Sequence, residues 1–501
     1  MGIRSAIREL FRPDRKPKAQ RMFQGASINR LTTDWVTSGT SMDSEIRGSL
    51  RTLRNRSRQL VRDNDFARQA IRTIQNNVVG QGVGFQSQVR MQRGGGKLDQ
   101  LTNDAIEQAW QEWSRKGTCD VGGRLCFSDI ERLIIRAVAE SGEVLVRMVQ
   151  QPFGGSTIPL GLEILESDLL LDDYNGQAEN GNEIRMGVEV DRWGRPQAYY
   201  FAKGFRHPGD YMFSMNGSYI REKWIRVPAE EILHIYIVER PGQTRGVPWM
   251  SSAIERLHQM AGYEEAEVVA ARASASLMGF ITSPEGELSA DDVFQGDRVT
   301  EFSPGKFAYL APGEQITVPN INRPSGEFDP FMRAMLRGVS AGLGCSYEAI
   351  SHDFSQTNYS SSRLSLLEER EYYRILQDWL IENFHQPVFE RWLDLAVLSG
   401  TLDLGRYEMD PGFYRKPRWM PRGWGWVDPQ KEVASSILAV QAGFKTVGQI
   451  IAESGGDIEE VFQQRKREVD LAEQLGLNLS TDVPPAQEPT DTGVTPSGRP
   501  A

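Results

Sequence analysis

The sequence predicts an α+β protein, in which short strands follow a first group of helices and a long helix lies nearer the C-terminus. Residues 98–143 carry apolar side chains at the spacing of two amphipathic helices. Short strand-like runs follow as far as residue 236, with a hairpin turn at 192–196. Residues 362–398 then repeat apolar side chains at helical spacing over about 50 Å, at roughly 1.5 Å per residue.

The composition is that of a globular chain with an acidic balance. The chain has 501 residues, of which 39% are hydrophobic, and this length allows two to four domains. A formal net charge of −10 argues against a protein that coats nucleic acid by neutralising phosphates, although a like-charged wall favours sliding of DNA. No stretch approaches the length of a transmembrane helix and no signal peptide is visible, so we expect no membrane partner.

The residue types that usually carry chemistry form no recognisable catalytic or metal-binding motif. The cysteines Cys119, Cys126 and Cys345 lack CxxC spacing, and neither HExxH nor G-x-S-x-G occurs. We therefore expect no catalytic residue, no metal and no cofactor, and a reducing cytoplasm fits the unpaired cysteines. The enzymatic alternative is a nucleic-acid-processing enzyme, such as a nuclease, that uses His352 and Asp353.

The first part of the chain divides into an arm and a mixed domain. Residues 1–44 mix basic residues with Pro, Gly and Ser, and we expect a flexible basic arm. Residues 45–250 are predicted to form the α+β domain. Four arginines of its first helix lie three or four residues apart and share one stripe: Arg51, Arg54, Arg58 and Arg62. This stripe could bind DNA or an acidic neighbouring subunit, or it could be a solvated helix face.

Two helices with an insertion between them follow. Residues 251–277 form a helix rich in Ala and Glu, and residues 327–343 form a second helix with Arg333 and Arg337 on one face. The insertion, residues 278–326, contains short strand-like runs and lacks the spacing of a phosphate-binding loop.

A polar, hydroxyl-rich loop over residues 344–361 then hangs between helices, and the long helix and its connector occupy residues 362–427. Pro387 should kink the long helix near Asn383, because proline removes an amide and clashes with the preceding turn. The candidate functional residues of the loop are short polar side chains and one tyrosine: Ser351, Ser355, Gln356, Thr357, Asn358, Tyr359 and Ser360.

The C-terminal part begins with three tryptophans among Pro, Gly and Arg: Trp419, Trp424 and Trp426. Such residues can stack nucleobases, but an irregular loop fixed to the core by its aromatic rings is the better interpretation. Asp428 and Pro429 are typical of a helix start and open a predicted helical domain over residues 428–478. Residues 479–501 are rich in Pro, Thr, Ser and Gly, and we expect a disordered tail.

Several short motifs occur in order along residues 45–475: Arg56–Arg62, Asn77–Gly80, Ile232–His234, Arg240–Trp249, Ser346–Glu348, Asp353–Phe354, Asn358–Ser361 and Asp428–Glu432. No motif decides alone, but the ordered set resembles the lambda family of bacteriophage portal proteins. The resemblance implies a portal fold with the following parts: an α/β wing (45–250), two stem helices (251–277 and 327–343), a small β-containing clip (278–326), a tunnel loop (344–361), a long kinked wing helix (362–427) and a helical crown (428–478).

The resemblance also implies a function. The chain would form a homododecameric ring at one capsid vertex of the virion, assembled in the host cytoplasm, and double-stranded DNA would pass through its axis during packaging and ejection. The tunnel loop would contact this DNA without sequence specificity. Arg333 and Arg337 would face the bore or pair with Glu264 or Glu267 of a neighbouring stem. Terminase, the major capsid protein and head–tail connector proteins would be its partners.

Overall fold

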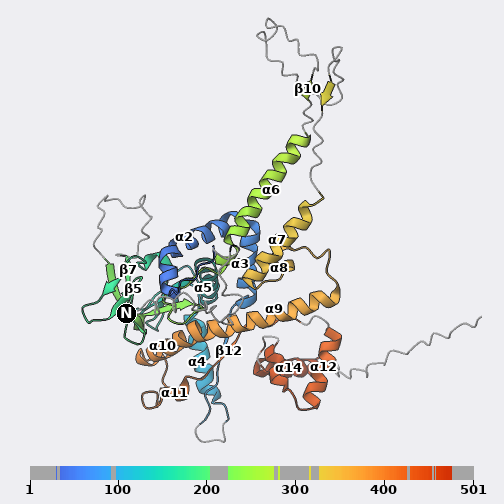
Figure 1. The fold of residues 1–501 in the computed structure, drawn as a ribbon. Helices are drawn as coiled ribbons and strands as arrows, with labels where there is room; N and C mark the ends of the chain where they lie inside the picture. Colours follow the sequence, from blue (N-terminus) through green and yellow to red (C-terminus); the bar gives the residue numbers. More distant parts are fainter. Residues whose placement is uncertain are drawn as a thin grey trace, which may run out of the picture.

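Figure 1 shows the computed structural model of the chain, which describes residue 30 and residues 34–91, 97–202, 224–275, 280–282, 315–317, 326–425, 429–453, 456 and 458–476. Most of the predicted arm, most of the predicted clip over residues 278–326 and the whole predicted tail over residues 479–501 lie outside these described residues.

The N-terminal helices form one side of the main core. They are α2 (Met42–Asp63), α3 (Asp65–Val78), α4 (Gln100–Trp113) and α5 (Phe127–Ser141). The two helices predicted within residues 98–143 are thereby confirmed. Side-chain oxygens of Ser41 and Asn64 accept hydrogen bonds from the first turns of α2 and α3, which fixes where these helices begin. Ile74 and Ile134 are completely buried where α3 packs against α5.

Two antiparallel sheets follow α5. The first has the strand order β3-β2-β9, and the second is a meander with the order β4-β5-β6-β7-β8. The strands of the first sheet are β2 (Glu143–Val149), β3 (Gly161–Leu165) and β9 (Ile232–Tyr236). Those of the second are β4 (Gly176–Gln177), β5 (Glu183–Arg185), β6 (Val188–Val190), β7 (Pro196–Ala202) and β8 (Trp224–Pro228). Short 3-10 turns lie beside them, at Ser167–Leu169, Ala229–Glu231 and Trp249–Ser252. The predicted hairpin turn joins β6 to β7.

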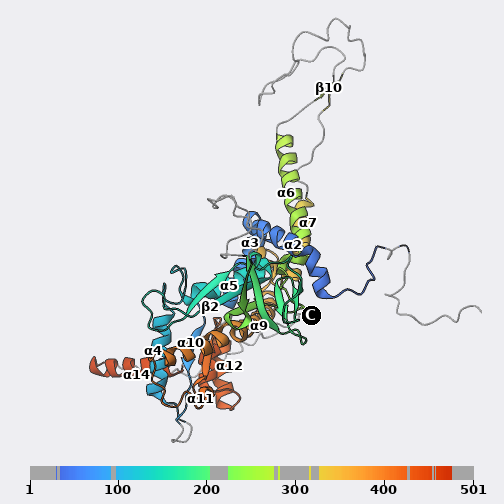
Figure 2. The ribbon, with the colours of Figure 1, turned by 90° about the vertical axis from the view of Figure 1, so that its left-hand side faces the viewer.

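A helix pair stands out from this body in both views (Figures 1 and 2). Helix α6 (Ile254–Ala275) leads away and α7 (Phe328–Leu343) returns beside it, with the antiparallel pair β10 (Phe280–Thr282) and β11 (Gln315–Thr317) between them in the chain. The ring of Tyr263 in α6 lies 5.7 Å from the ring of Phe328 and 4.7 Å from that of Phe331, and these contacts join the middle of α6 to the beginning of α7.

The predicted long helix is confirmed as α9 (Tyr359–Leu380) and α10 (Gln386–Leu398), joined by a π-helical turn at Ile381–His385. Because Pro387 has no amide, it cannot donate to the carbonyl of Asn383, and the irregularity lies where the sequence predicts it. The Asn383 amide donates instead to the Trp379 carbonyl at 2.8 Å. Helix α10 is a core element, with Phe389 and Trp392 fully buried.

The C-terminal part returns to the core before it forms a helical group. Strand β12 (Pro417–Met420), which follows α11 (Pro411–Tyr414), pairs with β1 (Gly84–Ser87), so that Phe85 lies opposite Trp419. The predicted C-terminal helices are present as α12 (Pro429–Gln441), α13 (Val447–Glu453) and α14 (Ile458–Gln474). No helix in the described ranges has the length and apolar character that crossing a membrane requires.

Candidate functional site

The junction between α7 and the polar loop requires glycine. Gly344 ends α7 with φ of +68°, and a Cβ at this position would lie 2.8 Å from the ring of Tyr372. The next turn is fixed to α9, because Glu369 accepts hydrogen bonds from both the amide and the hydroxyl of Ser346, each at 3.1 Å. Ser346 in turn caps a short helix, α8 (Tyr347–Ser351). The predicted loop over residues 344–361 is therefore shorter than expected, with only residues 352–358 between α8 and α9.

Asp353 is the central anchor of this shortened loop. Its carboxylate accepts hydrogen bonds from the Tyr347 hydroxyl at 2.9 Å and the Ser355 amide at 3.0 Å, and Arg333 Nε lies 3.5 Å away. The bonds from Ser355 and Tyr347, together with Arg333, lower the pKa of Asp353 to about 2. The carboxylate is therefore ionised at neutral pH and already bound by groups of its own chain. His352, beside it, is exposed and ends α8 in the left-handed conformation.

The two arginines of α7 both reach toward this loop. Arg333 also pairs with Asp329 at 3.0 Å, and its Nη2 lies 3.5 Å from the Ser355 hydroxyl. The guanidinium of Arg337 lies 5.6 Å from the centre of the Tyr347 ring. The prediction that both arginines share one face of the helix is confirmed, and the structure shows that this face contacts α8 and the loop of the same chain.

The two predicted glutamates of α6 are both shielded from solvent, Glu264 in part and Glu267 almost completely. Burial, reinforced by the charge of Asp65, raises the pKa of Glu264. Glu267 is only 6% exposed. Among the described residues, the ion pairs of Arg333 are with Asp329 and Asp353, so its pairing with a neighbouring stem stays a prediction.

The predicted loop residues divide into structural and exposed ones. Ser351 donates to the Tyr347 carbonyl at 2.8 Å, and Thr357 donates to the Phe354 carbonyl at 3.0 Å, so both hydroxyls shape the backbone. Tyr359 and Ser360 belong to the first turn of α9. The remaining predicted residues are exposed: Ser355, Gln356 and Asn358. Phe354, which belongs to one of the quoted motifs but was not predicted as a functional residue, is 62% exposed beside them. In Figure 1 this loop lies at the end of α9 that points away from the sheets.

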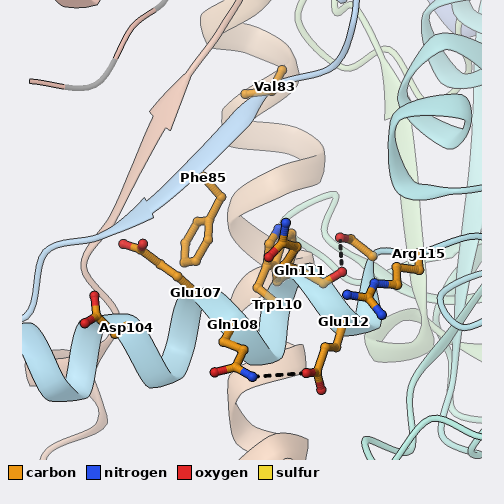
Figure 3. Close-up of a pocket in the computed structure, with 10 residues that line it drawn as sticks. Val83, Phe85, Asp104, Glu107, Gln108, Trp110, Gln111, Glu112 and Arg115 are labelled. Carbon is orange, nitrogen blue, oxygen red and sulfur yellow. Dashed lines mark hydrogen bonds between the residues drawn. The ribbon is translucent and has the colours of Figure 1, made fainter. Parts of the chain in front are cut away.

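A pocket of about 680 Å³ lies elsewhere, between α4 and β1 (Figure 3). Phe85 of β1 points toward Glu107 and Trp110 of α4, while Gln108 and Glu112 bond to each other at 3.3 Å. Glu107 also accepts a hydrogen bond from the Ser87 amide at 2.7 Å. No set of three or more His, Cys, Asp or Glu side chains in the described residues could hold a metal ion.

The predicted arginine stripe of α2 is divided. The side chains of Arg51 and Arg62 are 66% and 73% exposed, as the solvated-face interpretation expects, whereas Arg54 contradicts that interpretation. Arg54 is completely buried and pairs with Glu143 at 2.9 Å. Each of the other members also pairs with an acid of the same chain: Arg51 with Asp172, Arg58 with Asp168, and Arg62 with Asp63. Asp63 is the neighbour of Arg62 in the chain, but Glu143, Asp168 and Asp172 lie on segments whose proximity to α2 only the fold establishes.

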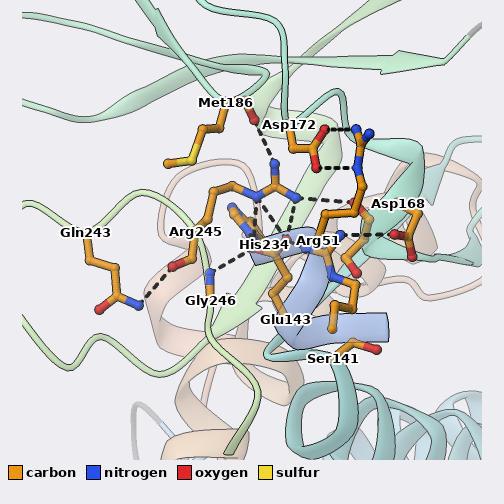
Figure 4. A network of polar contacts seen from close by, with 12 residues as sticks. Arg51, Ser141, Glu143, Asp168, Asp172, Met186, His234, Gln243, Arg245 and Gly246 are labelled. Atoms are coloured by element: carbon orange, nitrogen blue, oxygen red, sulfur yellow. Dashed lines mark hydrogen bonds and ion pairs between the residues drawn. The ribbon is translucent and has the colours of Figure 1, made fainter. Parts of the chain in front are cut away.

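Glu143, at the start of β2, is the centre of a buried charge cluster that also contains Arg54, Asp168, His234 and Arg245 (Figure 4). Its carboxylate accepts hydrogen bonds from Arg245 Nε at 2.9 Å and from the Gly246 amide at 2.8 Å, and it lies 2.9 Å from His234 Nε2. This Glu143 cluster joins α2, β2, β9 and the segment before α6.

The protonation states in the Glu143 cluster are mutually consistent. Burial alone would raise the pKa of Glu143, but Arg245 and His234 outweigh burial and hold this pKa well below its ordinary value. Burial lowers the pKa of His234 more than Glu143 raises it. At neutral pH the cluster therefore contains two arginine cations and two carboxylate anions, with His234 neutral.

The match to known proteins covers the described loop and the helices around it. Residues 29–377 match the model of the family described as phage portal protein, lambda family. The chain belongs to the lambda family of phage portal proteins. The portal-family match runs from the segment before α2 into α9, so it includes α6, α7 and the loop that Asp353 anchors.

The chain aligns over nearly its whole length with proteins that are named portal proteins. The chain is 31% identical to a probable portal protein of Halomonas phage phiHAP-1, over 96% of this chain and 94% of that protein. It is 23% identical to portal protein B of Escherichia phage lambda, over 90% of both chains. Among solved structures, one chain from the neck of a native gene transfer agent particle has a TM-score of 0.44 and 15% identity, and covers 79% of this chain and 92% of that one.

Proposed function

We propose that this chain forms a closed homododecameric ring at one vertex of a phage capsid, and that double-stranded DNA passes through the ring during packaging and ejection. The family match over residues 29–377 carries this proposal, supported by the 96% coverage against a probable portal protein. A ring of identical copies requires contacts between two different surfaces of each subunit that close after a full turn.

Uncovered apolar side chains on the outer helices support assembly. Helix α9 has Leu364, 69% exposed, and Ile375, 66% exposed, although its opposite side is part of the core. The C-terminal helices expose a comparable set: Ile437, Leu438, Phe462 and Leu471. Apolar surface of this kind is costly to leave in water, and in the proposed ring neighbouring copies cover it.

The loop between α8 and α9 borders the proposed channel. Ser355, Gln356 and Asn358 are exposed there and present short polar groups, which contact a DNA backbone without reading sequence. Arg333, whose Nη2 lies 3.5 Å from the Ser355 hydroxyl, is paired with Asp329 and Asp353. Because its charge is already balanced by these carboxylates, it binds a DNA phosphate only weakly. A net charge of −10 for each copy also favours passage of DNA over retention.

The other parts take the roles that their positions suggest. Residues 45–250 form the wing, residues 251–277 and 327–343 form the stem, and residues 428–478 form the crown. The insertion over residues 278–326 is the clip, where terminase docks during packaging and head–tail connector proteins replace it later. The wing contacts the major capsid protein, and assembly takes place in the host cytoplasm.

The ring acts as a passive conduit in this proposal, not as an enzyme. The alternative of a nuclease that uses His352 and Asp353 receives no support from the geometry. Asp353 is held by Tyr347, Ser355 and Arg333 of its own chain, and a metal-dependent nuclease would need that carboxylate for its ion.

Electron microscopy of the purified chain tests the proposal. Class averages should show a ring of twelvefold symmetry with an open centre. Particles without a central opening, or monomers at every concentration tested, would overturn it. Deletion of residues 355–360 should then leave the ring intact and reduce DNA packaged or retained in particles, because the proposal assigns this segment to contact with DNA. Loss of the ring in this deletion would contradict the assignment of the loop.

A further inference from the structure

A group of arginines surrounds Trp424, which follows β12. The indole Nε1 of Trp424 donates to the Asn77 side chain at 3.1 Å, so the ring is fixed to the end of α3. The guanidinium groups of Arg370 and Arg374, one turn apart on α9, lie 5.8 Å and 5.7 Å from the centre of this ring. Arg422 completes what we call the Arg–Trp cluster, defined by Arg370, Arg374, Arg422 and Trp424.

The guanidinium groups of this cluster keep most of their donors. Among the described residues, Arg370 donates to the Gly425 carbonyl at 3.2 Å, Arg374 pairs with Glu371, and Arg422 donates to the Asn76 carbonyl. Each guanidinium carries five N–H donors, so the exposed Arg374 and Arg422 each have donors available to an external acceptor. Arg370 Nε is buried without a partner, while the Arg374 side chain is 50% exposed and Arg422 is exposed.

The cluster also holds more positive than negative charge. Burial lowers the pKa of Arg370, and the neighbouring Arg374 and Arg422 lower it further, against the opposing effect of Glu432. Glu432 is shared with Arg363, which lies 3.5 Å from it. Among the described residues, the three arginines of the cluster together with Arg363 thus interact with two glutamates, Glu371 and Glu432. Like charges held this close destabilise the folded chain, and an external anion between them would offset the repulsion.

We infer that the Arg–Trp cluster binds the phosphodiester backbone of double-stranded DNA, at a site separate from the loop between α8 and α9. Phosphate suits the site because several guanidinium groups converge on one surface. Nucleobase stacking does not suit it, because Trp424 is anchored to Asn77 and two guanidinium groups already lie over its ring.

The position of the cluster relates it to the proposed channel. Arg370 lies eleven residues beyond the start of α9 at Tyr359, which corresponds to about 16 Å along the helix. Helix α9 connects the loop and the cluster rigidly, and we infer that a duplex in the proposed ring contacts both. This relation rests on the proposed function, whereas the binding site itself lies within one chain and needs no ring.

Binding of a short fluorescein-labelled duplex to the full purified chain, followed by anisotropy across a salt series, tests the inference. The double variant Arg374→Gln/Arg422→Gln should lower the slope of log affinity against log salt by about 2, because each lost phosphate contact removes about 0.9. Its affinity should then be roughly tenfold weaker at about 50 mM salt and approach the wild-type value at about 200 mM. Duplex and single strand of one sequence should compete without a preference for the single strand, because backbone phosphate and not a stacked base is bound.

A matched control is Arg132→Gln/Arg136→Gln on α5. Arg136 pairs with Glu140 within one helix as Arg374 pairs with Glu371, and Arg132 donates to the Gly80 carbonyl as Arg422 donates to that of Asn76. Equal salt slopes for the two double variants would overturn the inference. So would thermal stabilisation by inorganic phosphate without duplex binding, because the cluster would then take a free anion. Ring formation is measured separately, by electron microscopy. A chain that forms no ring is therefore distinguishable from a chain whose Arg–Trp cluster does not bind DNA.

Discussion

Glu143→Gln should be among the most destabilising single substitutions in this chain. The glutamine keeps the shape of the side chain but removes the charge that compensates Arg54 and Arg245, whose side chains are 1% and 0% exposed. It also turns an amide NH2 toward donors that now bond to carboxylate oxygen. Breaking a buried pair in this way costs about 3–5 kcal/mol, because a buried charge is left uncompensated. Asp168 remains as the only acid of the Glu143 cluster.

Urea unfolding followed by intrinsic tryptophan fluorescence measures the effect. With a slope of about 2 kcal/mol per M, the midpoint should fall by about 2 M. Glu163→Gln is the control, since Glu163 lies 3.7 Å from Arg147 on the same sheet but is 29% exposed, and such a pair contributes about 1 kcal/mol or less. If both variants shift the midpoint equally, the argument that Glu143 compensates two buried cations is wrong.

Two further predictions concern pH and the loop. Because burial depresses the pKa of His234, the unfolded chain binds a proton below about pH 6.5 that the folded chain does not, and stability falls as the pH drops below that value. His234→Gln should flatten the loss of stability between about pH 7 and pH 5, and an unchanged profile would exclude His234 as its source. Arg333→Gln removes the contacts to Asp353 and Ser355, so amide hydrogen exchange in residues 352–358 should become faster while α10 is unaffected. Exchange as slow as in the wild type would show that Tyr347 alone holds the loop.

Local signals in the sequence predicted the elements of this fold better than their partners. Apolar periodicity identified the helices within residues 98–143 and the long helix, and Pro387 located the irregularity in that helix because its cause is a missing amide. The side chains that bind Arg54 and Asp353 could not be predicted from such local signals. Glu143 reaches Arg54 only after β2 and α2 have packed, and no spacing rule connects residues so far apart in the chain.

The candidate loop shows the same limit at shorter range. Composition indicated a polar segment, but the sequence did not predict α8, because five residues give too little periodicity to separate a helix from a turn. It also gave no reason to expect that Ser351 and Thr357 would bond to backbone carbonyls rather than to DNA. Phe354 was missed because a single exposed aromatic residue has no sequence signature.

Charge balance distinguishes three groups of arginines among the described residues. In the Glu143 cluster, two buried guanidinium groups meet two carboxylates, so the charge is neutralised inside the fold and stabilises it. Beside the loop, Arg333 meets Asp329 and Asp353, so the segment proposed to touch DNA presents short polar groups and little free charge. Of these three groups, the one around Trp424 has more arginines than acids and remains partly exposed. A conduit that must release DNA needs weak contacts where the duplex moves, and a stronger backbone contact is compatible with movement only if it lies apart from them, as the Arg–Trp cluster does.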